Sequence, residues 1–129
     1  MKKTFGQGLS HRSCTADQIT ATASVSGGSA WYDGHFPGHP LLPGIAILAL
    51  VEEAILAAEL AEGRAMRITG VSRVRFRLPV KPDEELTLKI SRREGRVESN
   101  YLFTVSHAGE QTCTGAFKAK PAFRPIAGC

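Results

Sequence analysis

The chain has 129 residues and a mass of 13.9 kDa, with 43% hydrophobic and 22% charged residues. This length suits one domain with one core, and the composition excludes disordered and collagen-like proteins. The formal net charge of +4 favours an acidic partner or ligand. No recognisable nucleic-acid module accompanies that charge, so we expect no nucleic-acid partner.

The apolar stretches are too short for a membrane protein. The longest, residues 45–51, falls far below the ~18 residues of a membrane span. The N-terminus starts with Met1, Lys2 and Lys3, but polar residues follow where a signal peptide needs an apolar segment. We therefore predict a cytoplasmic protein without a membrane span.

The three cysteines are irregularly spaced along the chain: Cys14, Cys113 and Cys129. They fit neither a disulfide framework nor a zinc site, so we predict free thiols and no bound metal. Cys113 lies in a strand-like stretch and is expected to be a small core residue.

The first predicted element is a strand over residues 18–26, where Ile, Ala and Val alternate with Thr and Ser. His11 is expected to precede the folded core, which we place at about residues 18–119. Residues 31–44 contain three prolines and three glycines, which predicts a loop of fixed path. A helix is expected from Gly44 to about residue 62, with Gly63 as its C-cap.

The first turns of this helix, residues 45–51, are apolar on every side, which predicts burial all around its axis. Strand-like patterns follow at residues 70–78, 85–92, 97–106 and 111–119. One long helix packed against consecutive antiparallel strands gives a single α+β domain over residues 1–129, with a strongly curved sheet.

The loop and the helix start carry a motif. Residues 34–44 read GHFPGHPLLPG, and residues 70–82 read GVSRVRFRLPVKP. Both segments resemble the signatures of the 3-hydroxyacyl-acyl carrier protein dehydratases, and the resemblance covers residues 18–119. It implies a hotdog fold, in which a curved antiparallel sheet wraps one central helix. It also implies reversible dehydration of 3-hydroxyacyl thioesters to trans-2-enoyl thioesters in fatty acid or related polyene or polyketide-type biosynthesis.

The same resemblance assigns roles to residues. His35 matches the catalytic histidine of the family, and its ordinary pKa of ~6.5 suits a base near neutral pH. Gly44 matches the glycine whose N–H faces the thioester carbonyl, and the helix N-terminus adds partial positive charge there. We expect Phe36, Pro43 and Ala49 to contact the substrate as well.

Ala49 departs from the family, which carries a Glu or Asp at that position. Glu52 and Glu53 follow about one helical turn later, roughly 5 Å along the axis. Glu53 is the candidate second catalytic residue, and a buried carboxylate with a raised pKa is the alternative. Water could also substitute at a reduced rate, or the missing carboxylate could come from a homologous subunit in a heterodimer.

Arg73, Arg75 and Arg77 alternate with apolar residues, which places them on one face of a strand. Either they form a solvated face or they dock an acyl carrier protein, phosphopantetheine or coenzyme A phosphate. Nearby cations could contribute: Arg64, Arg67, Lys81, Arg92 and Arg93.

The remaining candidates have less specific patterns. His11, His39 and His107 are expected on the surface, and Asp33 in an exposed turn. A group of apolar residues lines either an acyl tunnel or the core: Trp31, Phe36, Ile45, Leu48 and Val51.

The sequence thus predicts a dehydratase that needs no metal or redox cofactor, because its substrate is carried on phosphopantetheine or coenzyme A. The expected partners are an acyl carrier protein and a second hotdog subunit, in a homodimer, a higher oligomer or a heterodimer. Ala49 leaves two alternatives open: a hotdog acyl thioesterase, or a catalytically impaired subunit that supports an active partner.

Overall fold

The computed structural model describes residues 9–14, 17–24, 44–81 and 83–122. In these ranges six strands form one antiparallel sheet in the order β1-β2-β4-β5-β6-β3, and one helix packs against it. The elements are β1 (Leu9–Cys14), β2 (Gln18–Ala23), α1 (Gly44–Ala61), β3 (Met66–Phe76), β4 (Leu86–Arg93), β5 (Ser99–His107) and β6 (Glu110–Pro121). The predicted α+β class is confirmed.

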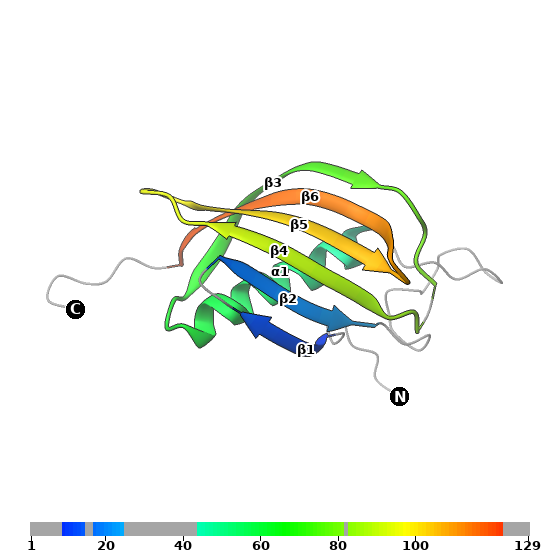
Figure 1. Ribbon diagram of the computed structural model, residues 1–129. Coiled ribbons are helices and arrows are strands. Elements are labelled where there is room, and N and C mark those ends of the chain that lie inside the picture. The colour runs from blue at the N-terminus through cyan, green and yellow to red at the C-terminus, as the bar shows by residue number, and fades with distance from the viewer. Residues whose placement is uncertain (1–8, 15–16, 25–43, 82, 123–129) are drawn as a thin grey trace, which may run out of the picture.

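The sheet curves over α1, which lies behind it in the view of Figure 1. Alternate residues of β2, β4, β5 and β6 point toward the helix and are buried, as the period of a strand requires. The largest fully buried side chains of this core include Ile19, Leu88, Ile90 and Tyr101. Cys113 is also buried with a free thiol, as predicted.

One face of α1 is left open by the sheet, so the prediction of burial on all sides is wrong for the described chain. The face toward the sheet consists of adjacent pairs of buried residues that recur every four positions, such as Leu50 with Val51 and Ala54 with Ile55. On the opposite side Ile45 is 67% exposed and Leu60 is 64% exposed. A single curved sheet covers only one side of a helix, which leaves the other side for a different contact.

The C-terminal end of α1 is closed by the predicted glycine. Gly63 has φ of 83°, a left-handed conformation that suits glycine. Its N–H donates to Leu60 O at 2.9 Å, and the N–H of Arg64 donates to Glu59 O at 2.9 Å. This pair of bonds is the Schellman motif, which turns the chain back and brings Arg64 next to Glu59.

The sheet begins earlier in the chain than predicted. His11 lies in β1 and pairs with Thr22 of β2, so it does not precede the folded core. At the other end β6 extends to Pro121, beyond the expected limit of residue 119. The strand at 70–78 also begins earlier, at Met66, and ends at Phe76.

In the described part of the chain no helix has the length and apolarity needed to cross a membrane.

Candidate active site

The start of α1 is the part of the predicted site that the structure describes. His35, Phe36 and Pro43 lie outside the described residues, as do Trp31, Asp33 and His39. Gly44 is the first residue of α1, and the first turn contains no acidic side chain. The N–H groups of a first helical turn have no partner within the helix and carry partial positive charge. This end of α1 can therefore bind an oxygen atom that gains negative charge.

Phe76 covers Gly44 from the end of β3. A Cβ atom built on Gly44 would lie 2.5 Å from the Cζ atom of Phe76, which is closer than packed carbon atoms approach. A larger residue at position 44 would therefore displace the Phe76 ring. Since Phe76 remains 53% exposed, the ring lies at the surface beside the first turn of α1.

Glu53 is a partly buried carboxylate on the second half of the same helix. Burial raises the pKa of Glu53. Its Oε2 atom is buried and has no hydrogen-bond partner among the described residues. Ala49 is also partly buried, one turn before Glu53 and roughly 6 Å away along the axis. A carboxyl group in this environment holds its proton to a higher pH, as a general acid must.

The expected tunnel residues of α1 have different environments. Val51 is fully buried in the core, and Leu48 is partly buried against it. Ile45 is exposed beside Gly44. The structure therefore gives Val51 a packing role and leaves Ile45 available at the surface near the helix start.

The arginines of β3 do not follow a regular alternation. Arg73 has φ of 57°, and the pairing of β3 with β6 shifts register between Ser72 and Arg75. This bulge puts an extra residue into the strand. Arg73, Arg75 and Arg77 are all exposed, but Arg77 lies beyond the end of β3. The exposure agrees with the prediction, whereas the single uninterrupted strand does not.

A buried ionic cluster at the far end of α1 was not predicted. Glu59 is 1% exposed and accepts a hydrogen bond from Tyr101 Oη at 2.7 Å. Arg92 Nε and an Arg64 guanidinium N–H each donate to its Oε1 atom at 3.0 Å. Arg92 also contacts Glu94 at 3.3 Å. Arg64 and Arg92 thus form ion pairs within the fold, and their part in docking stays a prediction.

The contacts of Glu59 decide its charge. Burial alone would raise the pKa of Glu59, but the hydrogen bonds from Tyr101 and Arg64 and the charges of Arg92 and Arg64 outweigh it, so the pKa is lowered. Burial and the bond to Glu59 raise the pKa of Tyr101 to about 12. The group is therefore a carboxylate whose two oxygen atoms both accept hydrogen bonds, Oε2 from Tyr101 and Oε1 from the two arginines.

Metal ligands do not gather in the described ranges. No group of three or more His, Cys, Asp or Glu side chains in those ranges has the arrangement of a metal site. His107 instead bonds to Glu85 O through Nδ1 at 2.9 Å and lies 2.9 Å from Glu84 through Nε2. The predicted surface histidine therefore ties β5 to the segment before β4.

Comparison with known proteins places this geometry in a family. The family model of the ApeI-like dehydratases, described as ApeI dehydratase, matches residues 11–116. A 3-hydroxyacyl-[acyl-carrier-protein] dehydratase FabZ from Myxococcus xanthus is 35% identical over 111 residues, which are 79% of this chain and 71% of that protein. The FabZ dehydratase of Syntrophobacter fumaroxidans is 33% identical over 81 residues, 59% of this chain and only 55% of its own length.

Solved structures share the fold. The dehydratase heterocomplex ApeI:P from Xenorhabdus doucetiae has a chain with a TM-score of 0.69 and 26% identity, covering 93% of this chain and 99% of that one. A mutant of a hypothetical thioesterase from Streptococcus pneumoniae TIGR4 has a TM-score of 0.75 at 15% identity, over 96% of this chain and 99% of that one. The predicted hotdog fold is confirmed by these neighbours.

Proposed function

The chain belongs to the ApeI-like dehydratase family, and we propose that it takes part in the reversible dehydration of 3-hydroxyacyl thioesters. The observation that carries the proposal is the match of the family over residues 11–116, which includes the helix start at Gly44. The proposed pathway is fatty acid biosynthesis or a related route to polyenes or polyketides. The protein is expected to act in the cytoplasm.

The proposed reaction removes water from the acyl chain. His35 takes a proton from C2, and the electrons form the C2–C3 double bond as the C3 hydroxyl leaves with a proton as water. The N–H of Gly44 and the positive end of α1 would stabilise the negative charge on the thioester oxygen in between. Phe36, Pro43 and Ala49 are the proposed substrate contacts. The acyl group is proposed to arrive on phosphopantetheine or coenzyme A, without a metal or redox cofactor.

Glu53 is the proposed source of the second proton. Burial raises the pKa of Glu53, which favours the protonated form that a general acid needs. Its position one turn beyond Ala49 calls for a bridging water between the carboxyl group and the leaving hydroxyl. Removing one acid or base group typically lowers a rate by ~10² to 10⁴.

The acyl carrier protein is the proposed partner that delivers the substrate. Arg75 and Arg77 are exposed on either side of Phe76, whose ring covers Gly44. Cations at this position would attract an acidic carrier beside the helix start. Arg73 is exposed two residues earlier and would add to the same field.

A second subunit is proposed along β3. This strand is one edge of the sheet formed by the described residues, and the backbone groups along such an edge can pair with another strand. Apolar side chains are exposed on this edge and on the adjoining helix start: Ile45, Val71, Phe76 and Leu78. An edge-to-edge homodimer, or a higher oligomer of such dimers, would cover them.

A heterodimer with a carboxylate-bearing relative is the second candidate. Ala49 in place of an acid and the similarity to a chain of the ApeI:P heterocomplex favour it. In that arrangement this chain would supply His35 or stabilise an active partner. The two candidates make different predictions for the isolated protein.

The deciding experiment is mass-spectrometric detection of water loss from a 3-hydroxyacyl carrier protein. We expect wild type to dehydrate the substrate, His35→Ala to be inactive and Glu53→Gln to be at least ~10²-fold slower. Glu52→Gln is the matched control on the same helix and should retain activity. If wild type is inactive and Ala49→Glu is active, the heterodimer hypothesis replaces that of a homodimeric enzyme. Release of free thiol without an enoyl product would overturn dehydration in favour of a thioesterase.

A further inference from the structure

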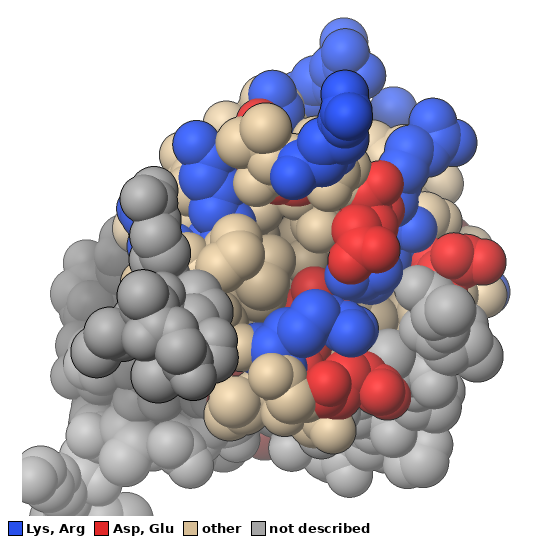
Figure 2. Space-filling view, turned by 90° about the vertical axis from the view of Figure 1, so that its left-hand side faces the viewer, with Lys and Arg blue, Asp and Glu red and all other residues tan. Residues whose placement is uncertain are grey.

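The end of the molecule at which α1 begins also contains the end of β3 and the beginning of β6. These three element ends lie together on the right-hand side of Figure 1. The opposite end, which faces the viewer in Figure 2, carries acidic and basic side chains next to one another. Ion pairs of Glu59 fix α1 at that far end. The contacts at the start of α1 involve uncharged groups instead.

Thr112 is an extra residue in β6. Val105 of β5 pairs with Cys113 of β6. The next residue of β5, Ser106, pairs with Gln111, which leaves Thr112 without a partner in the ladder and makes a β-bulge. Thr112 is 2% exposed, and its Oγ1 atom donates a hydrogen bond to Val105 O at 3.1 Å. The buried hydroxyl therefore ties the bulge to β5.

The same bulge fixes the end of β3. The last pair of β3 with β6 is Phe76 with Cys113. Beyond that pair, Thr112 O accepts hydrogen bonds from the N–H of Arg77 at 2.8 Å and from the N–H of Leu78 at 3.4 Å. The backbone is thus held on both sides of Phe76, by the ladder before it and by Thr112 after it.

The ring of Phe76 points with its tip toward Gly44. Phe76 lies on the inner face of the sheet, because it pairs with the buried Cys113 and paired residues share a face. A Cβ atom built on Gly44 would lie 2.5 Å from Cζ, 2.9 Å from Cε1 and 3.0 Å from Cε2 of the ring. Cζ is therefore the ring atom that comes nearest to the start of α1.

This ring borders the N–H groups of the first turn of α1, which have no partner within the helix. Its carbon atoms keep water away from one side of these groups. A donor in contact with less water interacts more strongly with an oxygen that gains negative charge. The position of the Phe76 ring therefore affects how strongly the start of α1 binds such an oxygen.

We propose that Phe76 and Thr112 are positioning residues of the proposed active site. Thr112 holds the end of β3, and this holds the Phe76 ring against Gly44 where the thioester oxygen binds. Thr112 does not touch the substrate and acts through Phe76. The inference rests on the proposed function, since that function names an acyl thioester as the ligand of this helix start.

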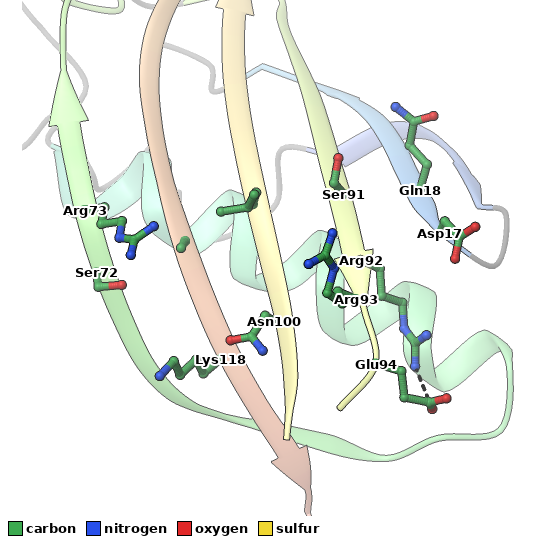
Figure 3. A pocket seen from close by; sticks show the side chains of 12 residues that line it. Asp17, Gln18, Ser72, Arg73, Ser91, Arg92, Arg93, Glu94, Asn100 and Lys118 are labelled. Atoms are coloured by element: carbon green, nitrogen blue, oxygen red, sulfur yellow. Dashed lines mark hydrogen bonds and ion pairs between the residues drawn. The ribbon is translucent and has the colours of Figure 1, made fainter. Parts of the chain in front are cut away.

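The outer face of the sheet supplies a matched control. Thr114 is partly buried and follows Thr112 by two residues in β6. It lies on the same face as Lys118, because alternate residues of a strand share a face. Figure 3 shows Lys118 beside an open hollow on that outer face, together with Ser72 and Asn100. Thr114→Val therefore makes the same chemical change as Thr112→Val, but on the face away from α1.

The test is nuclear magnetic resonance of the ¹⁵N-labelled protein, in which the Gly44 amide signal reports both the nearby ring and a bound ligand. The ligand is butyryl-pantetheine, a saturated thioester that can neither lose nor add water. Its titration gives a dissociation constant without turnover. Water loss from a 3-hydroxyacyl carrier protein is measured in parallel, sedimentation velocity gives the oligomeric state, and circular dichroism establishes that each variant is folded.

The Phe76 variants test the position of the ring. Phe76→Tyr adds an oxygen to Cζ, the atom that has no room in front of it at Gly44. We expect Phe76→Tyr to shift the Gly44 amide signal without ligand and to weaken thioester binding about tenfold, as Phe76→Leu should. A ring that only covers the surface would accept the added hydroxyl without loss of binding.

The Thr112 variants test the action through Phe76. Thr112→Val should shift the free Gly44 signal and weaken binding about threefold or more, whereas Thr112→Ser keeps the hydroxyl and should retain most of the affinity. Thr114→Val should bind like wild type. In the Phe76→Leu background, Thr112→Val should cause no further loss, because residues that act through one another are not additive.

Four results would overturn the proposal. Wild-type affinity in Phe76→Tyr would mean that the ring does not position the ligand. A further loss from Thr112→Val in the Phe76→Leu background would mean that Thr112 acts independently of the ring. Loss of oligomer in Phe76→Tyr would assign the ring to a contact between subunits. Absence of thioester binding to wild type would remove the ligand itself.

The parallel assay separates these results from failure of the proposed function. If wild type binds butyryl-pantetheine but removes no water from the carrier-bound substrate, dehydration by this chain alone is refuted. The binding comparison among the variants still decides the roles of Phe76 and Thr112 in that case.

Discussion

Replacing Glu59 by Gln tests whether the buried ionic cluster holds the C-terminal end of α1. Glutamine keeps the size of the side chain and can still accept a hydrogen bond from Tyr101. It removes the negative charge from a site that is 1% exposed and leaves Arg92, which is 9% exposed, facing a neutral group. Among the described residues, the exposed Glu94 is then the remaining ionic partner of Arg92.

The size of the effect follows from this burial. Removing one partner of a buried ion pair costs about 3–5 kcal/mol, because the remaining charge stays desolvated. Arg64 is 41% exposed and can return to water, so the cost should lie at the lower end, about 3 kcal/mol. For a domain of this size that corresponds to a midpoint of thermal unfolding roughly 10 °C lower.

Thermal and urea unfolding followed by circular dichroism measure this loss, at one fixed protein concentration. Glu62→Gln is the matched control, since Glu62 is exposed just beyond α1, and it should change the unfolding free energy by less than about 0.5 kcal/mol. The double variant with Arg92→Met should give a coupling energy above about 1 kcal/mol. Equal stabilities for the two glutamine variants would refute the cluster as an anchor of the helix.

Three further outcomes follow from the contacts. The folded pKa of Glu59 is lowered, so the carboxylate stabilises the folded state fully above the ordinary pKa of 4.5. This stabilisation is lost as pH falls through the lowered pKa. The unfolding temperatures of wild type and Glu59→Gln should therefore converge in acid. Gly115→Ala should destabilise by about 1–3 kcal/mol in urea unfolding, because the new Cβ would lie 2.6 Å from a ring carbon on β5; Gly70→Ala, with open space around it, should not. Since the pKa of Glu53 is raised, wild type loses stability as pH rises above 4.5, and Glu53→Gln should unfold at a higher temperature than wild type at pH 7 but not at pH 4; Glu52→Gln is its control.

Patterns of burial made most of the fold predictable. The alternation in β2, β4, β5 and β6 reflects one face against α1, and Gly63 marks the end of the helix because its φ of 83° suits glycine. β1 gave no such pattern, since its residues LSHRSC are mostly polar and do not alternate. An edge strand can be held by backbone pairing with β2, which leaves no hydrophobic period to detect.

The candidate site was predicted only as far as local motifs reach. Gly44 starts α1 as expected, but its contact with Phe76 joins positions 32 residues apart and has no local signal. The sequence does not distinguish Glu59 from a glutamate on the exposed surface of a helix. Its burial depends on Arg92 and Tyr101, which face it only because β4 and β5 pair at that register. A glutamate among Ala and Leu near a C-cap glycine is the one hint that could have been used.

The two ends of α1 differ in a way that fits a site at its start. The C-terminal end is closed by the Schellman bonds and fixed to β4 and β5 through Glu59. At the N-terminal end, the N–H groups of the first turn have no partner within the helix, and Phe76 and Ile45 remain exposed beside it. A group that stabilises developing charge needs a fixed position, since a small displacement of that group lowers the reaction rate. Anchoring the helix at the end far from the proposed chemistry supplies that position without occupying the N–H groups that the substrate would use.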